Sequence, residues 1–288
     1  MSGRIIRREL LRALVLGALL STSYMGVGAA ADYPITGDTI SGNHDLQEQY
    51  NLFNLDGNQK VTATSDVTVV SSGTEIENKA AIIDGRNNSG SSLDLNMDGH
   101  SLSIESYPYT FYMTSSNHKI DVHDADTISV KAIGRPIMYM PVGSGNEINL
   151  QANKDILLTQ VKDDFDSPSM SVKGDNTLSL KAGNDIVLHN DVKSNILTVS
   201  NKADLQIEAG HDVVFNRVSA EPYIPNLYVE RNANATVNAG NDIIFNPSTR
   251  SSSVFMVLDS SIVITPSLET FSIASATISP TDSSAAEI

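Results

Sequence analysis

The sequence contains no cysteine and no tryptophan, and only 6% of its 288 residues are aromatic. No disulfide can therefore constrain the fold, so stability must come from packing and backbone hydrogen bonds. Basic residues are also scarce, with 19 Lys and Arg against 34 Asp and Glu and a formal net charge of −15. Nucleic acid and anionic lipid are poor partners for such a surface, because both carry the same sign of charge.

Helical spacing of the apolar residues is lacking as well. Apolar and polar residues instead alternate, which is the pattern of a strand with one buried face. One phrase occurs three times: Ala-Gly-Asn-Asp-Ile-Val-Leu at 182–188, Ala-Gly-His-Asp-Val-Val-Phe at 209–215 and Ala-Gly-Asn-Asp-Ile-Ile-Phe at 239–245. Similar segments extend this repeat in both directions along the chain.

The first apolar residue of each copy recurs every 27 to 30 residues. These origins are Leu93, Ile120, Ile148, Leu178, Leu205, Ala235 and Ile262. A period in this range indicates a solenoid or array. Each period holds three alternating runs, and the turns between them lack the two-residue signals of hairpins. The sequence therefore predicts an all-β fold, a right-handed parallel β-helix with three short strands per coil, in which equivalent strands pair at roughly 4.8 Å.

Four parts of the chain can be distinguished. Residues 1–31 are typical of a secretory signal peptide, with a basic start, a short apolar run and small residues at 29–31 for cleavage. Residues 32–60 are expected to form an amino-terminal cap, because the first coil of a solenoid otherwise exposes a strand edge. Residues 61–275 are expected to form the β-helix, and 276–288 a Ser/Thr/Ala-rich tail.

The turn between the first two strands of a coil is the best-specified feature. Its Ala-Gly-Asn-Asp sequence supplies a small inward residue, a glycine free to take positive φ, and side-chain oxygens for the local backbone. Four aspartates lie seven residues after their origins: Asp155, Asp185, Asp212 and Asp242. We expect them to stack above one another and to shape the turns. A calcium-binding edge would need a glycine-aspartate repeat of nine residues, which this sequence does not have.

A second stretch resembles a calcium loop. Asp94–Glu105 has acidic or amide residues at its first, third and fifth positions, glycine at the sixth and glutamate at the twelfth. That loop requires a helix on each side, whereas the apolar residues here alternate as in the other coils. We therefore expect a strand, a turn and a strand, and leave open only incidental calcium binding.

The remaining polar residues suggest little chemistry. The six histidines have no metal-ligand spacing and are expected to be solvated turn residues: His44, His100, His118, His123, His189 and His211. The best acidic cluster is Asp163, Asp164 and Asp166, which could serve a polysaccharide lyase-like or hydrolase-like β-helix enzyme. Aromatic residues for stacking on sugars are scarce, so we expect a solvated loop. The sequence predicts no enzyme and no catalytic, cofactor-binding or metal residues.

The repeats at 182–188, 209–215 and 239–245, together with the signal and the lack of cysteine, resemble the β-helical passenger regions of bacterial type V secreted proteins. These are the autotransporters and filamentous-haemagglutinin-type adhesins, and the resemblance covers roughly residues 93–273. It implies a non-enzymatic protein exported to the Gram-negative cell surface or outer membrane, or secreted, that serves adhesion or surface display. It implies as partners host or neighbouring-cell surface molecules and an outer-membrane translocator barrel. This chain does not encode that barrel, so we expect an amino-terminal fragment of a longer protein.

Overall fold

The computed structural model describes residues 33–46, 51–71, 81–140, 145–161, 167–218, 224–246, 255–266, 271–273 and 286–287. These residues form the strands β1 (Thr39–Leu46), β2 (Phe53–Asn54), β3 (Asn58–Ser71), β4 (Ala81–Asp84), β5 (Ser92–Asn96), β6 (Leu102–Ser106), β7 (Tyr109–Tyr112), β8 (Lys119–Ala125), β9 (Ile128–Ala132), β10 (Met138–Met140), β11 (Glu147–Ala152), β12 (Ile156–Gln160), β13 (Met170–Lys173), β14 (Thr177–Ala182), β15 (Ile186–Asn190), β16 (Leu197–Ser200), β17 (Asp204–Ala209), β18 (Val213–Arg217), β19 (Leu227–Glu230), β20 (Asn234–Ala239), β21 (Ile243–Asn246), β22 (Phe255–Leu258), β23 (Ser261–Pro266), β24 (Phe271–Ile273) and β25 (Ala286–Glu287). Within these ranges there is no helix, and hence none that could cross a membrane.

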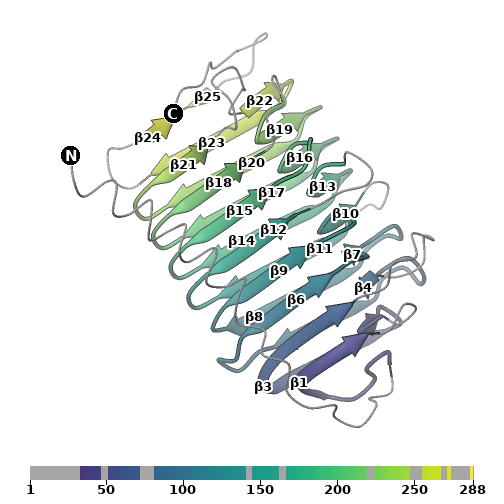
Figure 1. The fold of residues 1–288 in the computed structure, drawn as a ribbon. Helices are drawn as coiled ribbons and strands as arrows, with labels where there is room; N and C mark the ends of the chain where they lie inside the picture. The colour runs from purple at the N-terminus through teal and green to yellow at the C-terminus, as the bar shows by residue number, and fades with distance from the viewer. Residues whose placement is uncertain are drawn as a thin grey trace, which may run out of the picture. The chain divides into compact units, whose positions relative to one another are not determined.

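The strands form two sheets that run along a stack of coils (Figure 1). One sheet has 17 strands and the other has 8. A regular coil contributes two strands to the larger sheet and one to the smaller, as β14, β15 and β16 do. The strand pairs within the described ranges are parallel. The predicted fold class is confirmed, because the chain is an all-β solenoid of about seven turns built from parallel strands.

The predicted origins are register partners throughout the stack. The pairs are Leu93 with Ile120, Ile120 with Ile148, Ile148 with Leu178, Leu178 with Leu205, Leu205 with Ala235, and Ala235 with Ile262. A slip of one residue would move every apolar side chain of a strand to the opposite face. The buried face therefore holds the register, as the repeat predicts.

The inward side chains of all three strands form one continuous core. Leu180, Leu188 and Val199 come from the three strands of one coil, and each is fully buried. Phe215 and Phe245 are partners in adjacent coils, and their rings stack with centroids 4.6 Å apart. Full burial of one such side chain stabilises the fold by about 1.5–3 kcal/mol. This core, with the hydrogen bonds between coils, holds the fold together without any disulfide.

The first coils depart from the regular repeat. Strand β3 is a single run of 14 residues that pairs with both β5 and β6, so its coil lacks the turn between the first two strands. Residues 32–60, where a cap is expected, contain β1 and β2, and β1 lies parallel to β3. The expected signal, residues 1–31, lies outside the described residues, as does most of the expected tail, residues 276–288.

Candidate functional site

The turn after the first strand brings the backbones of successive coils into contact. A Cβ atom on Gly183 would lie 2.2 Å from the carbonyl oxygen of Asn153, and one on Gly210 would lie 2.1 Å from that of Gly183. The same distance for Gly240 is 2.0 Å, measured to the oxygen of Gly210. None of these three glycines has a positive φ, so the expectation that they adopt a left-handed conformation is wrong. Glycine is required because no side chain fits between the stacked turns.

The aspartates of this turn stack as predicted and connect each coil to the next. Oδ1 of Asp155 accepts a hydrogen bond from the backbone N–H of Asp185 at 3.1 Å. Oδ1 of Asp185 accepts from the N–H of Asp212 at 3.0 Å, and Oδ1 of Asp212 accepts from the N–H of Asp242 at 3.0 Å. We call these four residues the aspartate ladder. The carboxylates of Asp155, Asp185 and Asp212 satisfy turn N–H groups that the sheets leave unpaired.

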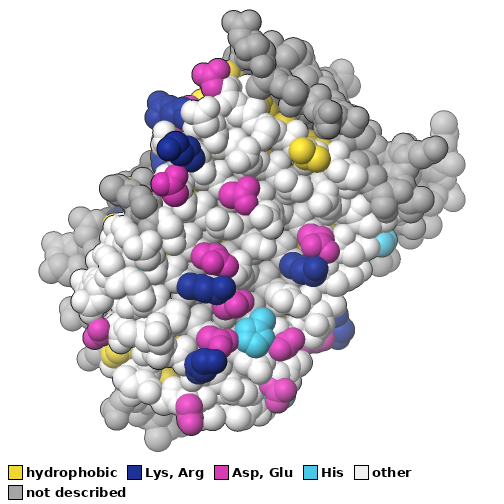
Figure 2. Space-filling view, turned by 180° about the vertical axis from the view of Figure 1, so that it is seen from behind, with side chains coloured by type: hydrophobic (Ala, Val, Ile, Leu, Met, Phe, Trp, Pro, Cys, Tyr) yellow, Lys and Arg dark blue, Asp and Glu magenta, His cyan; other side chains and the backbone are white. Residues whose placement is uncertain are grey.

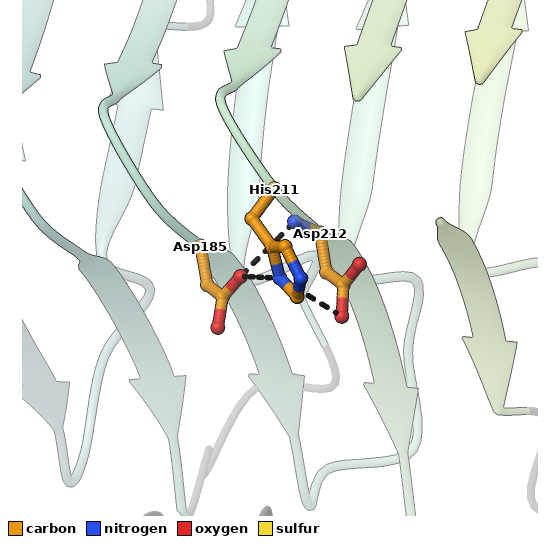
Figure 3. A group of neighbouring side chains, drawn as sticks. All are labelled: Asp185, His211 and Asp212. Carbon is orange, nitrogen blue, oxygen red and sulfur yellow. Dashed lines mark hydrogen bonds and ion pairs between the residues drawn. The ribbon is translucent and has the colours of Figure 1, made fainter. Parts of the chain in front are cut away.

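A histidine joins the middle of the aspartate ladder (Figure 3). Nδ1 of His211 lies 3.0 Å from Oδ1 of Asp185 and 3.4 Å from Oδ2 of Asp212. In the following coil Asn241 takes the place of His211, and its Nδ2 donates to Oδ1 of Asp212 at 2.7 Å. Histidine and asparagine therefore have the same role here, which is to bind the carboxylate of the preceding coil.

Asp185, His211 and Asp212 are the only cluster of three potential metal ligands in the described part of the chain. One ligand atom of each lies within 4.8 Å of the others. The sequence predicts no metal site, because the histidine spacings give no ligand set. The cluster is formed by residues of two stacked coils. Oδ1 of Asp185 and Oδ1 of Asp212 each accept a backbone N–H from the next coil. The cluster is explained by its role in holding coils together.

The calcium-loop match, Asp94–Glu105, is a strand, a turn and a strand, as expected. Asp94 lies 2.9 Å from Nε2 of His123, and this hydrogen bond, with help from a nearby lysine, lowers the pKa of Asp94. Glu105 accepts a hydrogen bond from Nζ of Lys131 at 3.1 Å. The two carboxylates are thus bound to different partners in the next coil, and they do not form a common ligand set.

The histidines differ in burial and in hydrogen bonding more than the sequence predicts. His118 is 1% exposed, and neither of its ring nitrogens makes a hydrogen bond. His44 lies within β1 and is 8% exposed, so the expectation of a solvated turn residue is wrong for both. The ring of His118 points inward beside Gly85. Burial lowers the pKa of His118, and nearby backbone groups offset only part of this effect. Burial also acts to lower the pKa of His123, but hydrogen bonds to Asp124 and Asp94 raise it overall.

An aromatic cluster lies on the outside of the smaller sheet and at its corner. Tyr112 of β7 and Tyr139 of β10 are register partners, and their rings stack with centroids 5.3 Å apart and planes at 9°. Tyr109 packs beside both, with centroids 4.5 Å and 5.4 Å away. The guanidinium of Arg86 lies 5.5 Å from the ring centroid of Tyr112, and that of Arg135 lies 5.7 Å from that of Tyr109. We call these five residues the tyrosine–arginine cluster.

Buried groups hold this cluster in place. Asp84 is 4% exposed, and its Oδ1 accepts a hydrogen bond from Nε of Arg86 at 2.8 Å, which raises the pKa of Arg86. The loops beside the sheet pack closely, because the ring of Tyr107 would lie 2.8 Å from a Cβ atom on Gly134. Sequence reasoning missed the cluster, although Tyr112 and Tyr139 are one period apart. Asp163, Asp164 and Asp166 lie outside the described residues.

Comparisons with known proteins yield no relative. No family model, no curated protein and no solved structure matches this chain. The fold alone therefore defines the class of protein, a parallel β-solenoid of about seven turns that is compatible with a β-helical passenger region.

Proposed function

We propose that this chain is a non-enzymatic, exported protein of the Gram-negative cell surface, a passenger-like β-solenoid that serves adhesion or surface display. The observation that supports the proposal is the pairing of equivalent residues from coil to coil, which is held by a continuous core and by the aspartate ladder. Such a stack presents an extended surface to a partner and needs no disulfide. Its partners in this proposal are host or neighbouring-cell surface molecules.

The distribution of charge supports a role in the presentation of a surface. Figure 2 shows a face on which acidic and basic side chains are interspersed and few hydrophobic side chains are seen. Several ion pairs join neighbouring coils: Lys119 with Glu147, Lys131 with Glu105, Lys154 with Asp126, and Lys181 with Glu208. Exposed pairs contribute only about 0–1 kcal/mol each, so their main effects are on register and solubility.

The acidic residues of the aspartate ladder also have a structural explanation. Asp185 and Asp212 each accept a backbone N–H from the next coil, and this role does not require a substrate. A carbohydrate-active enzyme remains the alternative, and it would depend on Asp163, Asp164 and Asp166. A single preparation of the protein can test both functions.

To test the proposal, the full chain is expressed in a Gram-negative host beside a variant that lacks residues 2–31. We expect the full chain to leave the cytoplasm, to lose its first 31 residues, and to retain cells when it is coated on beads. The truncated variant should stay in the cytoplasm. Retention of the full chain in the cytoplasm contradicts the proposal. Release of unsaturated or reducing sugars from a polysaccharide, abolished by Asp163→Asn, Asp164→Asn or Asp166→Asn, would favour the enzyme instead.

A further inference from the structure

We propose that the tyrosine–arginine cluster binds a neutral saccharide. This inference rests on the proposed function and names the class of surface molecule that one site would recognise. The rings of Tyr109, Tyr112 and Tyr139 are half-buried and lie within 5.4 Å of one another, centroid to centroid. In the described part of the chain no other group of three aromatic side chains packs together.

The chemistry of the cluster matches a sugar ring. Tyrosine combines an apolar ring with a polar tip, and a pyranose combines an apolar C–H face with hydroxyl edges. Within the described residues, the hydroxyl groups of Tyr112 and Tyr139 make no hydrogen bond, whereas that of Tyr228 in the same sheet donates to Glu230 at 3.0 Å. The two tyrosines thus offer hydroxyl groups to a ligand beside their rings. The bonds of Arg86 to Asp84 hold its guanidinium in position beside the ring of Tyr112.

The size of the cluster favours a small ligand over a protein. An aromatic side chain can bury about 150–250 Å², and most of each of these rings is already buried, so together they offer at most roughly 250 Å². A stable protein interface needs about 800 Å² from each partner. A saccharide of a few units can be bound by the smaller area, and repetition along a polysaccharide would add avidity.

The charge of the protein favours a neutral ligand. A net charge of −15 repels nucleic acid and acidic polysaccharides. Arg86 does not reverse this repulsion, because its ion pair with the buried Asp84 balances its charge. The guanidinium of Arg86 therefore acts mainly as a planar group beside the ring of Tyr112.

The test is native affinity electrophoresis of the full chain in gels that contain neutral polysaccharides (dextran, β-glucan, galactomannan) or acidic ones (alginate, polygalacturonate). We expect a neutral polysaccharide to retard the protein. The double variant Tyr112→Ala/Tyr139→Ala should bind it at least about tenfold more weakly, because two ring contacts are lost. The variant Tyr112→Phe/Tyr139→Phe, which keeps the rings, should retain part of the binding. Tyr228→Ala is the matched control from the same sheet and should bind as the wild type does.

A second measurement needs no variant and so does not depend on whether the double variant folds. The wild-type chain is treated with tetranitromethane with and without the retarding polysaccharide, and nitrated tyrosines are located by mass spectrometry. We expect protection of Tyr112 and Tyr139 but not of Tyr228. Equal nitration, retardation by acidic polysaccharides alone, or unchanged binding of the double alanine variant would overturn the inference.

The two proposals can fail separately. If free saccharide does not release the retained cells, and the double alanine variant retains them as well as the wild type does, the saccharide site is overturned and adhesion stands. A chain that binds the saccharide in gels but never leaves the cytoplasm would contradict the proposed function alone. Capture of a purified cell-surface protein at Tyr112 and Tyr139, with no binding of any neutral polysaccharide, would show that the ligand class is wrong.

Discussion

Gly210→Ala is the sharpest test of the contact between stacked turns. The added Cβ atom would lie 2.1 Å from the carbonyl oxygen of Gly183, where ordinary contact begins at about 3.4 Å. Relief of this clash requires the two coils to move apart by more than about 1 Å, since the obstacle is backbone and not a flexible side chain. Such a movement must stretch the hydrogen bonds that cross between the same two turns.

The structure sets the size of the effect. Overpacking of a tight site costs about 1–3 kcal/mol. Two cross-coil bonds are strained at once, from the N–H of Gly210 to the oxygen of Ala182 and from the N–H of His211 to the oxygen of Asn184, both at 2.9 Å. Each contributes about 1 kcal/mol. We therefore expect the free energy of unfolding to fall by about 3–5 kcal/mol, a large part of the total of a typical domain.

Urea unfolding followed by circular dichroism at the β-sheet band measures this loss. Gly37→Ala is the matched control, because a Cβ atom at Gly37 meets no atom within 4 Å and its φ is not positive. Stacked repeats can unfold in steps, so hydrogen exchange at the turn N–H groups serves as a local measurement. If Gly210→Ala and Gly37→Ala change stability equally, or if exchange at the turn of Gly210 is unchanged, the account of contacting turns is wrong.

Three further changes test individual side chains. Because burial lowers the pKa of His118 in the folded state, the unfolded chain binds the proton more readily, and the free energy of unfolding should fall as the pH drops below about 6.5. His118→Gln should reduce this fall, which is measured by urea unfolding at pH 7.5 and pH 5. If the difference in the free energy of unfolding between the two pH values is unchanged in the variant, His118 is not its cause. The pKa of His123 is raised in the folded state, so the effect on stability is opposite. The stabilisation by protonated His123 is fully present below about pH 6.5, and it is lost as the pH rises through the folded-state pKa. Asp94→Asn should therefore destabilise the fold more at pH 6 than at pH 9, by less than about 1 kcal/mol because the pair is partly exposed. Asp185→Ala should lower the free energy of unfolding by about 1–3 kcal/mol, because a backbone N–H loses its acceptor. Asp185→Asn keeps an acceptor oxygen and should retain most of this stability. Equal losses for the two variants would show that the acceptor is not the cause.

Period and alternation suffice to predict the stacking of the coils. The interval between Leu178 and Leu205 is one coil, so the two residues must be partners if equivalent strands pair, and they are. Alternation then assigns each side chain to the inside or the outside. The role of Asp185 and Asp212 follows from the same register, because equal distance from the origin places them in one column.

The unpredicted features arise where alternation ends. A glycine in a turn has two physical explanations, and only coordinates distinguish the positive φ expected of Gly183 from the close approach that is found. His118 precedes a strand at a corner, where a period of two does not assign a side chain to the inside or the outside. Tyr112 and Tyr139 could have been paired by applying the register to the third strand, whereas Arg86 reaches them from a loop that the repeat does not describe.

The aspartate ladder gives the solenoid a direction. At every step the acceptor belongs to the earlier coil and the donor to the later one, from Asp155 to Asp185 to Asp212 to Asp242. A newly synthesised coil therefore meets a carboxylate that is already positioned, and it needs nothing from the chain still to come. Assembly of this kind can proceed from the amino terminus onward one layer at a time, as the chain is synthesised.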